Sequence, residues 1–131
     1  MGESVNTTSR VSVGVAACVL VATAAFHGSG YPGAVAAAAT PGVSPFFARA
    51  IPGIWLFFSW HLIGVAGALI WAAVRASRPA RPLVVFCSVL VVADTVFVFT
   101  LAGMFAGTIL LAIAAGLTVM AAVRWSDDRQ V

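Results

Sequence analysis

Four long apolar stretches, separated by short polar segments, divide the chain. They cover approximately residues 11–26, 52–74, 83–101 and 107–123. Each is close to the roughly 20 residues that a helix needs to cross a bilayer. Because apolar and polar residues do not alternate within them, the pattern predicts helices rather than strands. We therefore expect an all-α membrane protein, a bundle of four transmembrane helices over residues 11–125, with polar tails at 1–10 and 126–131.

The longest irregular stretch lies between the first two predicted helices. Residues 27–33 and 40–45 are rich in glycine and proline, which interrupt regular structure, and residues 34–39 are apolar enough for a short helix. We expect this loop, which extends to about Arg49, to cover or gate a site. Pro52 falls in the first turn of the second predicted helix, where a missing N–H does no harm.

The first apolar stretch also has features of a signal peptide. A short basic start precedes it, and residues 22–24 have the small-x-small pattern of a cleavage site. The stretch is long for the apolar part of a signal peptide, however. Its removal would also leave three helices with an exposed face, so we expect it to be retained as the first transmembrane helix.

The composition supports a location in lipid. The chain is 62% hydrophobic and 8% charged, with a mean hydropathy of +1.07, whereas a soluble domain carries roughly 25% charged residues. The pI near 9.7 does not indicate nucleic-acid binding, because the arginines lie beside the apolar stretches and do not form a basic patch. The partner that the composition predicts is the bilayer.

The placement of arginine predicts the orientation. Six arginines fall on one side of a four-span arrangement: Arg10, Arg75, Arg78, Arg81, Arg124 and Arg129. Arg49 alone falls on the other side. The positive-inside rule then places both termini in the cytoplasm. We expect a multi-pass integral protein of a bacterial inner membrane.

His61 and Asp94 are the ionisable side chains that lie deepest within apolar stretches. An ionised carboxylate at bilayer depth costs at least ~2.5–3.5 kcal/mol, so a partner or a role is expected for it. His61 lies 14 residues from Arg75, and Asp94 lies 13 residues from Arg81. At about 1.5 Å per residue both are roughly 20 Å from the cytoplasmic edge, so neighbouring antiparallel helices could pair them.

Such a pair has a functional and a structural interpretation. As catalytic residues, the Asp94 carboxylate would orient His61 as a general base or metal ligand, or the two would relay a proton. The alternative is a buried hydrogen bond that fixes helix register.

Three residues of the first loop are candidates for the entrance of a ligand site. His27, Tyr31 and Arg49 should lie near the outer interface. Each also has a simpler interpretation: His27 as a cap at the interface, Tyr31 with Trp55 as an aromatic belt, and Arg49 as an anchor. Two histidines and one carboxylate fall short of a zinc or di-iron site.

Other small or polar side chains predict packing. Gly64, Gly67 and Gly116 should let helices approach closely, and Cys18 and Cys87 should be small buried hydrophobes. The hydroxyls within the apolar stretches should bond backbone carbonyls of their own helices. These are Ser59, Thr95, Thr100 and Thr108.

A family resemblance rests on the first loop and the third apolar stretch. It consists of the order His27…Pro32-Gly33…Pro41-Gly42…Ala48-Arg49-Ala50…Gly53, followed by Asp94…Val96-Phe97…Phe99. In these residues, about half the chain, the sequence resembles the styrene oxide isomerases. The resemblance implies a small four-helix membrane enzyme that binds heme b between protomers and uses its ferric iron as a Lewis acid to rearrange epoxides to aldehydes.

The chain departs from that family at two positions. The family's heme-ligating histidine directly follows the Ala-Arg-Ala triplet, where Ile51 stands here, and a catalytic asparagine six residues further on is replaced by Phe57. Heme b would therefore need His61 or His27 as its ligand.

Three functions follow from these features. The first is an enzyme or binder of an apolar small molecule, with His61 and Asp94 at the site and a heme-dependent isomerase as its most specific form. The second is an accessory or structural subunit of a membrane complex. The third is a proton-coupled small transporter that uses Asp94; four-helix multidrug exporters carry a glutamate in their first helix, whereas Glu3 precedes it here. Four short helices enclose little volume, so a homo-oligomer is expected.

Overall fold

The computed structural model describes residues 7–75 and 80–125. Within these ranges the chain is helical, with five helices: α1 (Thr7–Ser29), α2 (Tyr31–Ala38), α3 (Pro45–Arg75), α4 (Ala80–Ala102) and α5 (Ala106–Arg124). Four segments are long and apolar enough to cross a membrane, namely α1 with α2, α3, α4 and α5. This confirms the predicted all-helical chain with four segments of transmembrane length. The predicted C-terminal tail, the first six residues of the N-terminal tail, and Arg78 with Pro79 lie outside the described residues.

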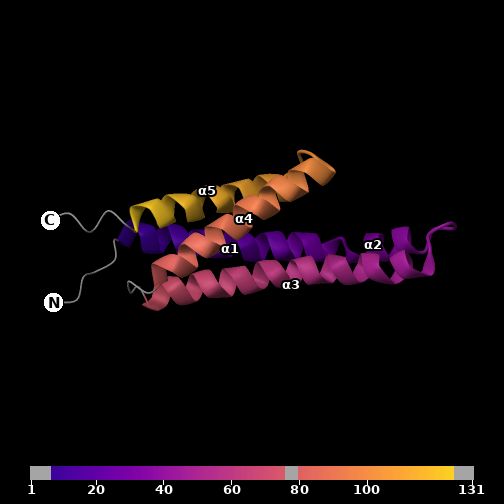
Figure 1. Cartoon of the computed structure of the whole chain (residues 1–131), viewed down its shortest axis with the longest axis horizontal. Coiled ribbons are helices and arrows are strands. Elements are labelled where there is room, and N and C mark those ends of the chain that lie inside the picture. The colour runs from indigo at the N-terminus through magenta and orange to yellow at the C-terminus, as the bar shows by residue number, and fades with distance from the viewer. Residues whose placement is uncertain (1–6, 76–79, 126–131) are drawn as a thin grey trace.

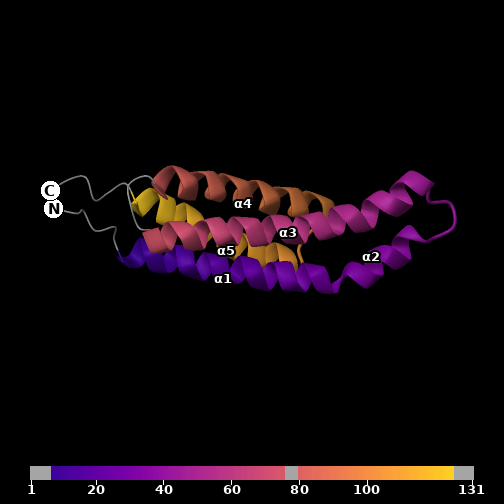
Figure 2. The same ribbon diagram turned by 90° about the horizontal axis from the view of Figure 1, so that it is seen from below.

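Helix α1 is the centre of the arrangement. It packs along α3 and α5, and α4 packs against α5 and α3 (Figures 1 and 2). Alanines allow these close contacts, because a side chain of one methyl group lets two backbones approach. The fully buried side chains of α1 include Ala16, Ala17 and Leu20, and Leu62, Leu69 and Leu111 fill the spaces around them.

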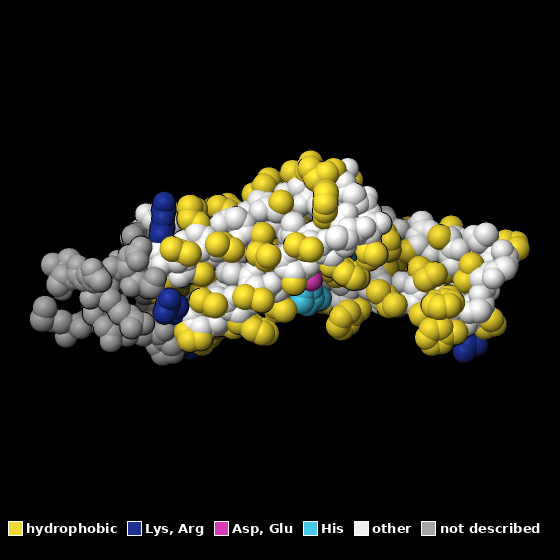
Figure 3. Space-filling view, turned by 45° about the horizontal axis from the view of Figure 1, so that its top comes forward, with side chains coloured by type: hydrophobic (Ala, Val, Ile, Leu, Met, Phe, Trp, Pro, Cys, Tyr) yellow, Lys and Arg dark blue, Asp and Glu magenta, His cyan; other side chains and the backbone are white. Residues whose placement is uncertain are grey.

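The outside of the bundle is apolar. Aromatic and branched aliphatic side chains cover much of its surface (Figure 3), and a water-soluble protein rarely exposes apolar area on this scale. Together with the four long helices, this surface indicates a multi-pass integral membrane protein. Cys18 belongs to the exposed surface, so its predicted burial is wrong, while Cys87 is buried as expected.

The glycines predicted to bring helices together do not do so. A Cβ added at Gly64, Gly67 or Gly116 would meet no atom within 4 Å. These glycines therefore face outward, and the close packing falls to the alanines.

The first loop is largely helical, in contrast to the prediction. Helix α3 begins at Pro45, seven residues before the expected start, so Pro52 lies inside the helix. Ser44 explains this start, because its hydroxyl accepts a bond from the Phe47 N–H (3.4 Å) and its carbonyl accepts one from the Ala48 N–H (2.9 Å). A serine cap followed by proline at the first helical position is a favourable helix start. Residues 7–10, expected in the polar tail, are likewise part of α1.

Helix α2 and the first part of α3 together form an arm at one end of the bundle. Helix α2 and the first part of α3 extend past the turn between α4 and α5 (Figure 1, right). The break between α1 and α2 falls at Gly30, whose N–H bonds the His27 carbonyl (3.0 Å). Proline causes the break, since Pro32 offers no N–H to the preceding turn and its ring clashes with it.

The turn between α4 and α5 requires a glycine. Gly103 has φ +72°, a left-handed conformation that costs a side chain roughly 1–2 kcal/mol. Phe105 then adopts an extended conformation (φ −150°, ψ 177°) before α5 begins. Its ring lies so close to Gly107 that an added Cβ there would come within 2.6 Å of it. This turn holds an aromatic ring beside the site described next.

Candidate functional site

His61 and Asp94 form a hydrogen-bonded pair between α3 and α4. Nε2 of His61 lies 2.9 Å from Oδ2 of Asp94, with 24% of the histidine and 18% of the aspartate side chain exposed. The structure thus brings together the two side chains whose depths matched in the sequence. Both side chains are partly exposed, and Figure 3 shows a histidine and an acidic side chain side by side on this face of the bundle. The pair is therefore reachable from outside, and it is not enclosed in the core.

His27 is held in place at the end of α1 by residues of α3. Its Nδ1 lies 3.0 Å from the Ser59 hydroxyl, and its carbonyl accepts a hydrogen bond from the Trp55 indole at 2.7 Å. The Trp55 ring stacks on the imidazole, with centroids 4.3 Å apart and planes 17° apart. Phe58 meets the imidazole edge-on at 5.0 Å. Three contacts therefore hold the ring itself, and the fourth holds the backbone of His27.

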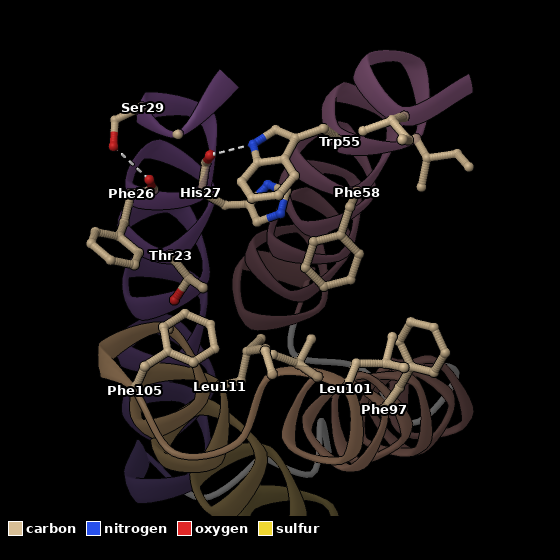
Figure 4. A pocket seen from close by; sticks show the side chains of 16 residues that line it. Thr23, Phe26, His27, Ser29, Trp55, Phe58, Phe97, Leu101, Phe105 and Leu111 are labelled. Atoms are coloured by element: carbon tan, nitrogen blue, oxygen red, sulfur yellow. Dashed lines mark hydrogen bonds between the residues drawn. The ribbon is translucent and has the colours of Figure 1, made fainter. Parts of the chain in front are cut away.

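A pocket of about 560 Å³ lies beside His27. It is bounded by α1, α3, α4 and α5, with Phe26 and His27 on one side, Trp55 and Phe58 on the next, and Leu101 and Leu111 facing them (Figure 4). Most of its lining is aromatic or aliphatic. Three lining side chains besides the Trp55 indole carry polar atoms, those of Thr23, His27 and Ser29.

Phe58 separates the pocket from the His61–Asp94 pair. Its ring lies 5.0 Å from the His27 ring and 6.1 Å from the His61 ring, measured between centroids. On α4, Phe97 and Val98 line the pocket and follow Asp94 by one helical turn. The pair itself does not line the pocket. It lies directly beyond Phe58, so the two polar features are neighbours rather than one site.

The three predicted entrance residues have different positions. His27 lines the pocket, whereas Tyr31 and Arg49 do not. Arg49 borders a separate hollow with Pro45, Phe46 and Ala50 at the far end of α3. Tyr31 and Arg49 therefore do not line this pocket, and their role at an entrance stays a prediction. The reason is the early start of α3, which turns the loop into helix and carries Arg49 away along the arm.

Two residues of the site had been assigned to other roles. Trp55 was expected in an aromatic belt, and it also contacts His27. Ser59 bonds the Trp55 carbonyl of its own helix as expected (3.5 Å), but its hydroxyl also lies 3.0 Å from Nδ1 of His27. Thr95, Thr100 and Thr108 do bond carbonyls of their own helix or of the turn before it. The sequence carried one signal for the site, the glycines that flank His27. A Cβ at Gly30 would lie 2.8 Å from Cζ2 of Trp55, so only glycine admits the indole there.

The residues present do not fit heme b inside this pocket of one chain. Ile51, which replaces the family's ligand, lines the pocket and offers no donor atom. His27 is the one lining residue with an imidazole, and no lining residue is a cation that could pair with heme propionates. His61 has its Nε2 engaged by Asp94. Among the described residues, no three His, Cys, Asp or Glu side chains are grouped to hold a metal ion.

Comparison with known proteins gives no assignment. The chain matches no protein-family model, no curated protein and no solved structure. The resemblance to the styrene oxide isomerases stays a prediction on the residues that carry it. The geometry itself offers an apolar pocket with one imidazole in its wall, and an imidazole–carboxylate pair directly beyond Phe58.

Proposed function

We propose that the protein binds a small apolar molecule in the pocket between α1, α3, α4 and α5. The observation that carries this proposal is the pocket itself, about 560 Å³ with a mainly aromatic and aliphatic lining. Pockets for small molecules have volumes of roughly 300–1,000 Å³ and combine apolar walls with a few placed polar groups. His27, fixed by its contacts with α3, is such a group.

The bilayer is the source of the molecule in this proposal. Three side chains at the rim of the pocket are more than half exposed: Ile54 at 66%, Phe97 at 59% and Leu101 at 71%. They therefore form an apolar opening on the outside of the bundle. An apolar molecule dissolved among acyl chains would reach this opening without crossing water.

The depth of the pocket follows from the proposed orientation, with both termini in the cytoplasm. The Nε–H of Arg10 donates to the Ala73 carbonyl at 3.0 Å, so the start of α1 lies beside the arginine-bearing end of α3. Trp55 lies 20 residues from Arg75, or about 30 Å along the helix. This is about the thickness of the hydrocarbon core. The pocket would then open at the outer boundary of the acyl chains.

The His61–Asp94 pair supports a second candidate function, acid–base chemistry on the bound molecule. A carboxylate at 2.9 Å fixes the orientation of the imidazole, and a positioned imidazole is a common general acid or base. Because Phe58 stands between the pair and the pocket, the reacting group would have to pass its ring. In this form the chain would be an enzyme, and the pair would be its catalytic residues.

Filling the opening of the pocket should weaken binding. Ala102 lines the rim and is exposed, so Ala102→Phe would place a ring in the opening with little disturbance of the core. Ala106→Phe is a matched control, because Ala106 is also exposed, lies four residues away, and does not line the pocket. We expect Ala102→Phe to weaken binding at least about tenfold, the loss of most apolar contact in the site, and Ala106→Phe to leave it unchanged.

Bromobenzene is a suitable probe, because it is apolar and its heavy atom quenches indole fluorescence. The host should be full-length protein in nanodiscs with Trp55 retained and Trp60, Trp71 and Trp125 replaced by phenylalanine. Site binding gives quenching that saturates, whereas collision within the lipid gives quenching that rises linearly. Linear quenching in the parent chain, or equal saturation in the Ala102→Phe and Ala106→Phe chains, would contradict the proposed function.

A further inference from the structure

The His61–Asp94 pair lies on the outside of the bundle, where a single chain in a membrane would expose it to acyl chains. Its side chains remain 24% and 18% exposed, and their neighbours Trp60 and Phe97 are exposed apolar side chains. Ionisable side chains at bilayer depth almost always face the interior of a bundle or a water-filled cavity. This pair faces outward and does not line the pocket beside His27, so we expect another molecule to cover it.

Each member of the pair has one polar atom left for such a molecule. Nε2 of His61 and Oδ2 of Asp94 contact each other, and across residues 7–75 and 80–125 no hydrogen bond engages Nδ1 of His61 or Oδ1 of Asp94. Neither atom is among the fully buried ones without a partner, so both can be reached from outside. A polar atom without a partner in the acyl-chain region costs free energy. A covering molecule that bonds both atoms would remove this cost.

The two free atoms complement each other, whichever atoms carry the protons. A pair without net charge, the form that apolar surroundings favour, holds two protons, either as imidazolium with carboxylate or as neutral imidazole with carboxylic acid. The contact between Nε2 and Oδ2 uses one of these protons. The other is on Nδ1 or on Oδ1. One free atom is therefore a donor and the other an acceptor, with no need to know which tautomer is present.

A second copy of this chain presents the matching atoms at the matching depth. Two copies in one orientation, related by a two-fold axis along the membrane normal, bring residues of equal depth together. The rotation places α3 of one copy opposite α4 of the other. Nδ1 of His61 can then bond Oδ1 of Asp94 in the second copy, and the same contact is made in reverse. A different protein would need an acid and a base of its own at this level.

Small residues beside the pair give the second copy room to approach. Gly64 lies one turn from His61 and is exposed, with no atom within 4 Å of an added Cβ. On α4, Ala93 precedes Asp94 and is also exposed. Small residues on a helix surface let backbones come close in lipid. Close approach is what a hydrogen bond between side chains of two copies requires.

We propose that two copies of the chain associate through the α3–α4 seam, defined by His61, Gly64, Ala93 and Asp94. The two His61–Asp94 pairs then form a closed ring of four hydrogen bonds, two within the chains and two between them. This inference goes beyond the proposed function, since it needs no ligand in the pocket.

The opening of the pocket stays in lipid in this dimer. Ile54 at the rim lies seven residues outward of His61, and Leu101 lies seven residues outward of Asp94, about 10 Å along each helix. A contact at the level of the pair therefore leaves the opening accessible. Association of two copies and binding of bromobenzene can then succeed or fail independently.

Gly64→Leu tests the contact without changing the pair. Full-length chains labelled at the C-terminus with a donor or an acceptor fluorophore are mixed in vesicles of phosphatidylethanolamine and phosphatidylglycerol, and energy transfer is followed as lipid is added. We expect the wild type to associate and Gly64→Leu to associate about five- to tenfold more weakly, the loss of two polar contacts between membrane helices. Gly116→Leu is the matched control, because Gly116 is equally open but lies on α5, and it should associate like the wild type.

A mixture of two variants tests the bonds between the chains. His61→Leu retains only the acid and Asp94→Leu only the base, so neither variant can form the pair within one chain. A dimer of the two still brings Asp94 of the first against His61 of the second, whereas a dimer of either variant with itself has no acid–base contact. We expect mixed dimers about threefold or more above their statistical proportion. A hydrogen bond confined to one chain cannot produce this preference.

Three results would overturn the proposal. Energy transfer of the wild type no higher than random proximity in the vesicle would mean that lipid or another protein covers the pair. Equal effects of Gly64→Leu and Gly116→Leu would place any dimer contact elsewhere. Mixed dimers at their statistical proportion would remove the ring, and circular dichroism of both variants shows whether they are folded. If either is not, the Gly64→Leu comparison decides, since it leaves the pair intact.

Discussion

Replacing either member of the His61–Asp94 pair alone should destabilise the protein, because the other member is left without its hydrogen-bond partner. We expect His61→Leu to lower the free energy of unfolding by about 1–3 kcal/mol, because it leaves a carboxyl group at bilayer depth without its partner. Asp94→Leu should cost less, because it removes the carboxyl group itself from the apolar span. The double substitution should cost less than the sum of the two, by about 0.6 kcal/mol and at most about 1.7 kcal/mol, the average and the maximum measured for polar pairs between membrane helices.

The measurement is a double-mutant cycle by reversible unfolding in mixed micelles. Thr100→Val is a suitable control on α4, because Thr100 is exposed and bonds only the Phe97 carbonyl. It should change stability by a few tenths of a kcal/mol, as surface substitutions usually do. Costs that simply add in the double variant would mean that the 2.9 Å contact contributes no coupling. The structural interpretation of the pair as a register lock would then fail.

Asp94→Asn separates the structural role of the pair from an acid–base role. Asparagine keeps the size of aspartate and can still accept a hydrogen bond from His61, but it cannot ionise. Stability should therefore change little, and bromobenzene should bind as in the parent chain, because neither member of the pair lines the pocket. Loss of a proton-dependent activity with binding and stability retained would identify the pair as catalytic. Loss of binding would show that the pair belongs to the ligand site instead.

The pair could be anticipated from the sequence because depth in a membrane helix is a matter of counting. His61 and Asp94 lie on spans joined by a short arginine-bearing turn, so residues at equal distances from that turn meet at one level. Helix α3 ends at Arg75 and α4 begins at Ala80, close to the predicted bounds, and the register was preserved. The rotation of α3 and α4 that turns the two side chains toward each other was not predictable from depth alone. Two polar side chains in lipid are, however, more stable in contact than apart.

The pocket was not predictable in the same way. Its walls depend on how each helix is rotated, and spans that are apolar on every side carry no hydrophobic stripe that would reveal the rotation. Trp55 illustrates the difficulty. Its depth in the membrane would be the same in an outer aromatic belt as in a stack on His27, so depth does not distinguish the two roles. Its bond to the His27 carbonyl joins residues 28 apart in the chain, across a loop whose path the sequence did not define.

The two prolines explain the error in the first loop. Pro45 and Pro52 each lie near the start of an apolar stretch, and either is compatible with the first turn of a helix. The choice depends on Ser44, whose hydroxyl and carbonyl cap α3. With the earlier start, α3 reaches 31 residues, and its first part carries Arg49 beyond the pocket.

Gly30→Ala should destabilise the chain and weaken binding, whereas Gly33→Ala, three residues later, should do neither. An added Cβ at Gly30 would lie 2.8 Å from Cζ2 of Trp55 and 3.3 Å from the His27 carbonyl oxygen. The indole edge could move away only by giving up its hydrogen bond or its stack. We expect a cost of about 1–3 kcal/mol, typical of overpacking, and several-fold weaker binding of bromobenzene.

Gly33→Ala should have the opposite effect on stability. A Cβ at Gly33 would meet no atom within 4 Å, and Gly33 lies within α2, so alanine should stabilise the helix by up to about 1 kcal/mol. Unfolding in mixed micelles gives the stability, and fluorescence of the chain that retains only Trp55 reports the indole. If Gly30→Ala were as stabilising as Gly33→Ala, the indole could not be held over Gly30. His27 would then lose the stack that fixes its ring, and the wall of the pocket would carry an imidazole of no fixed orientation.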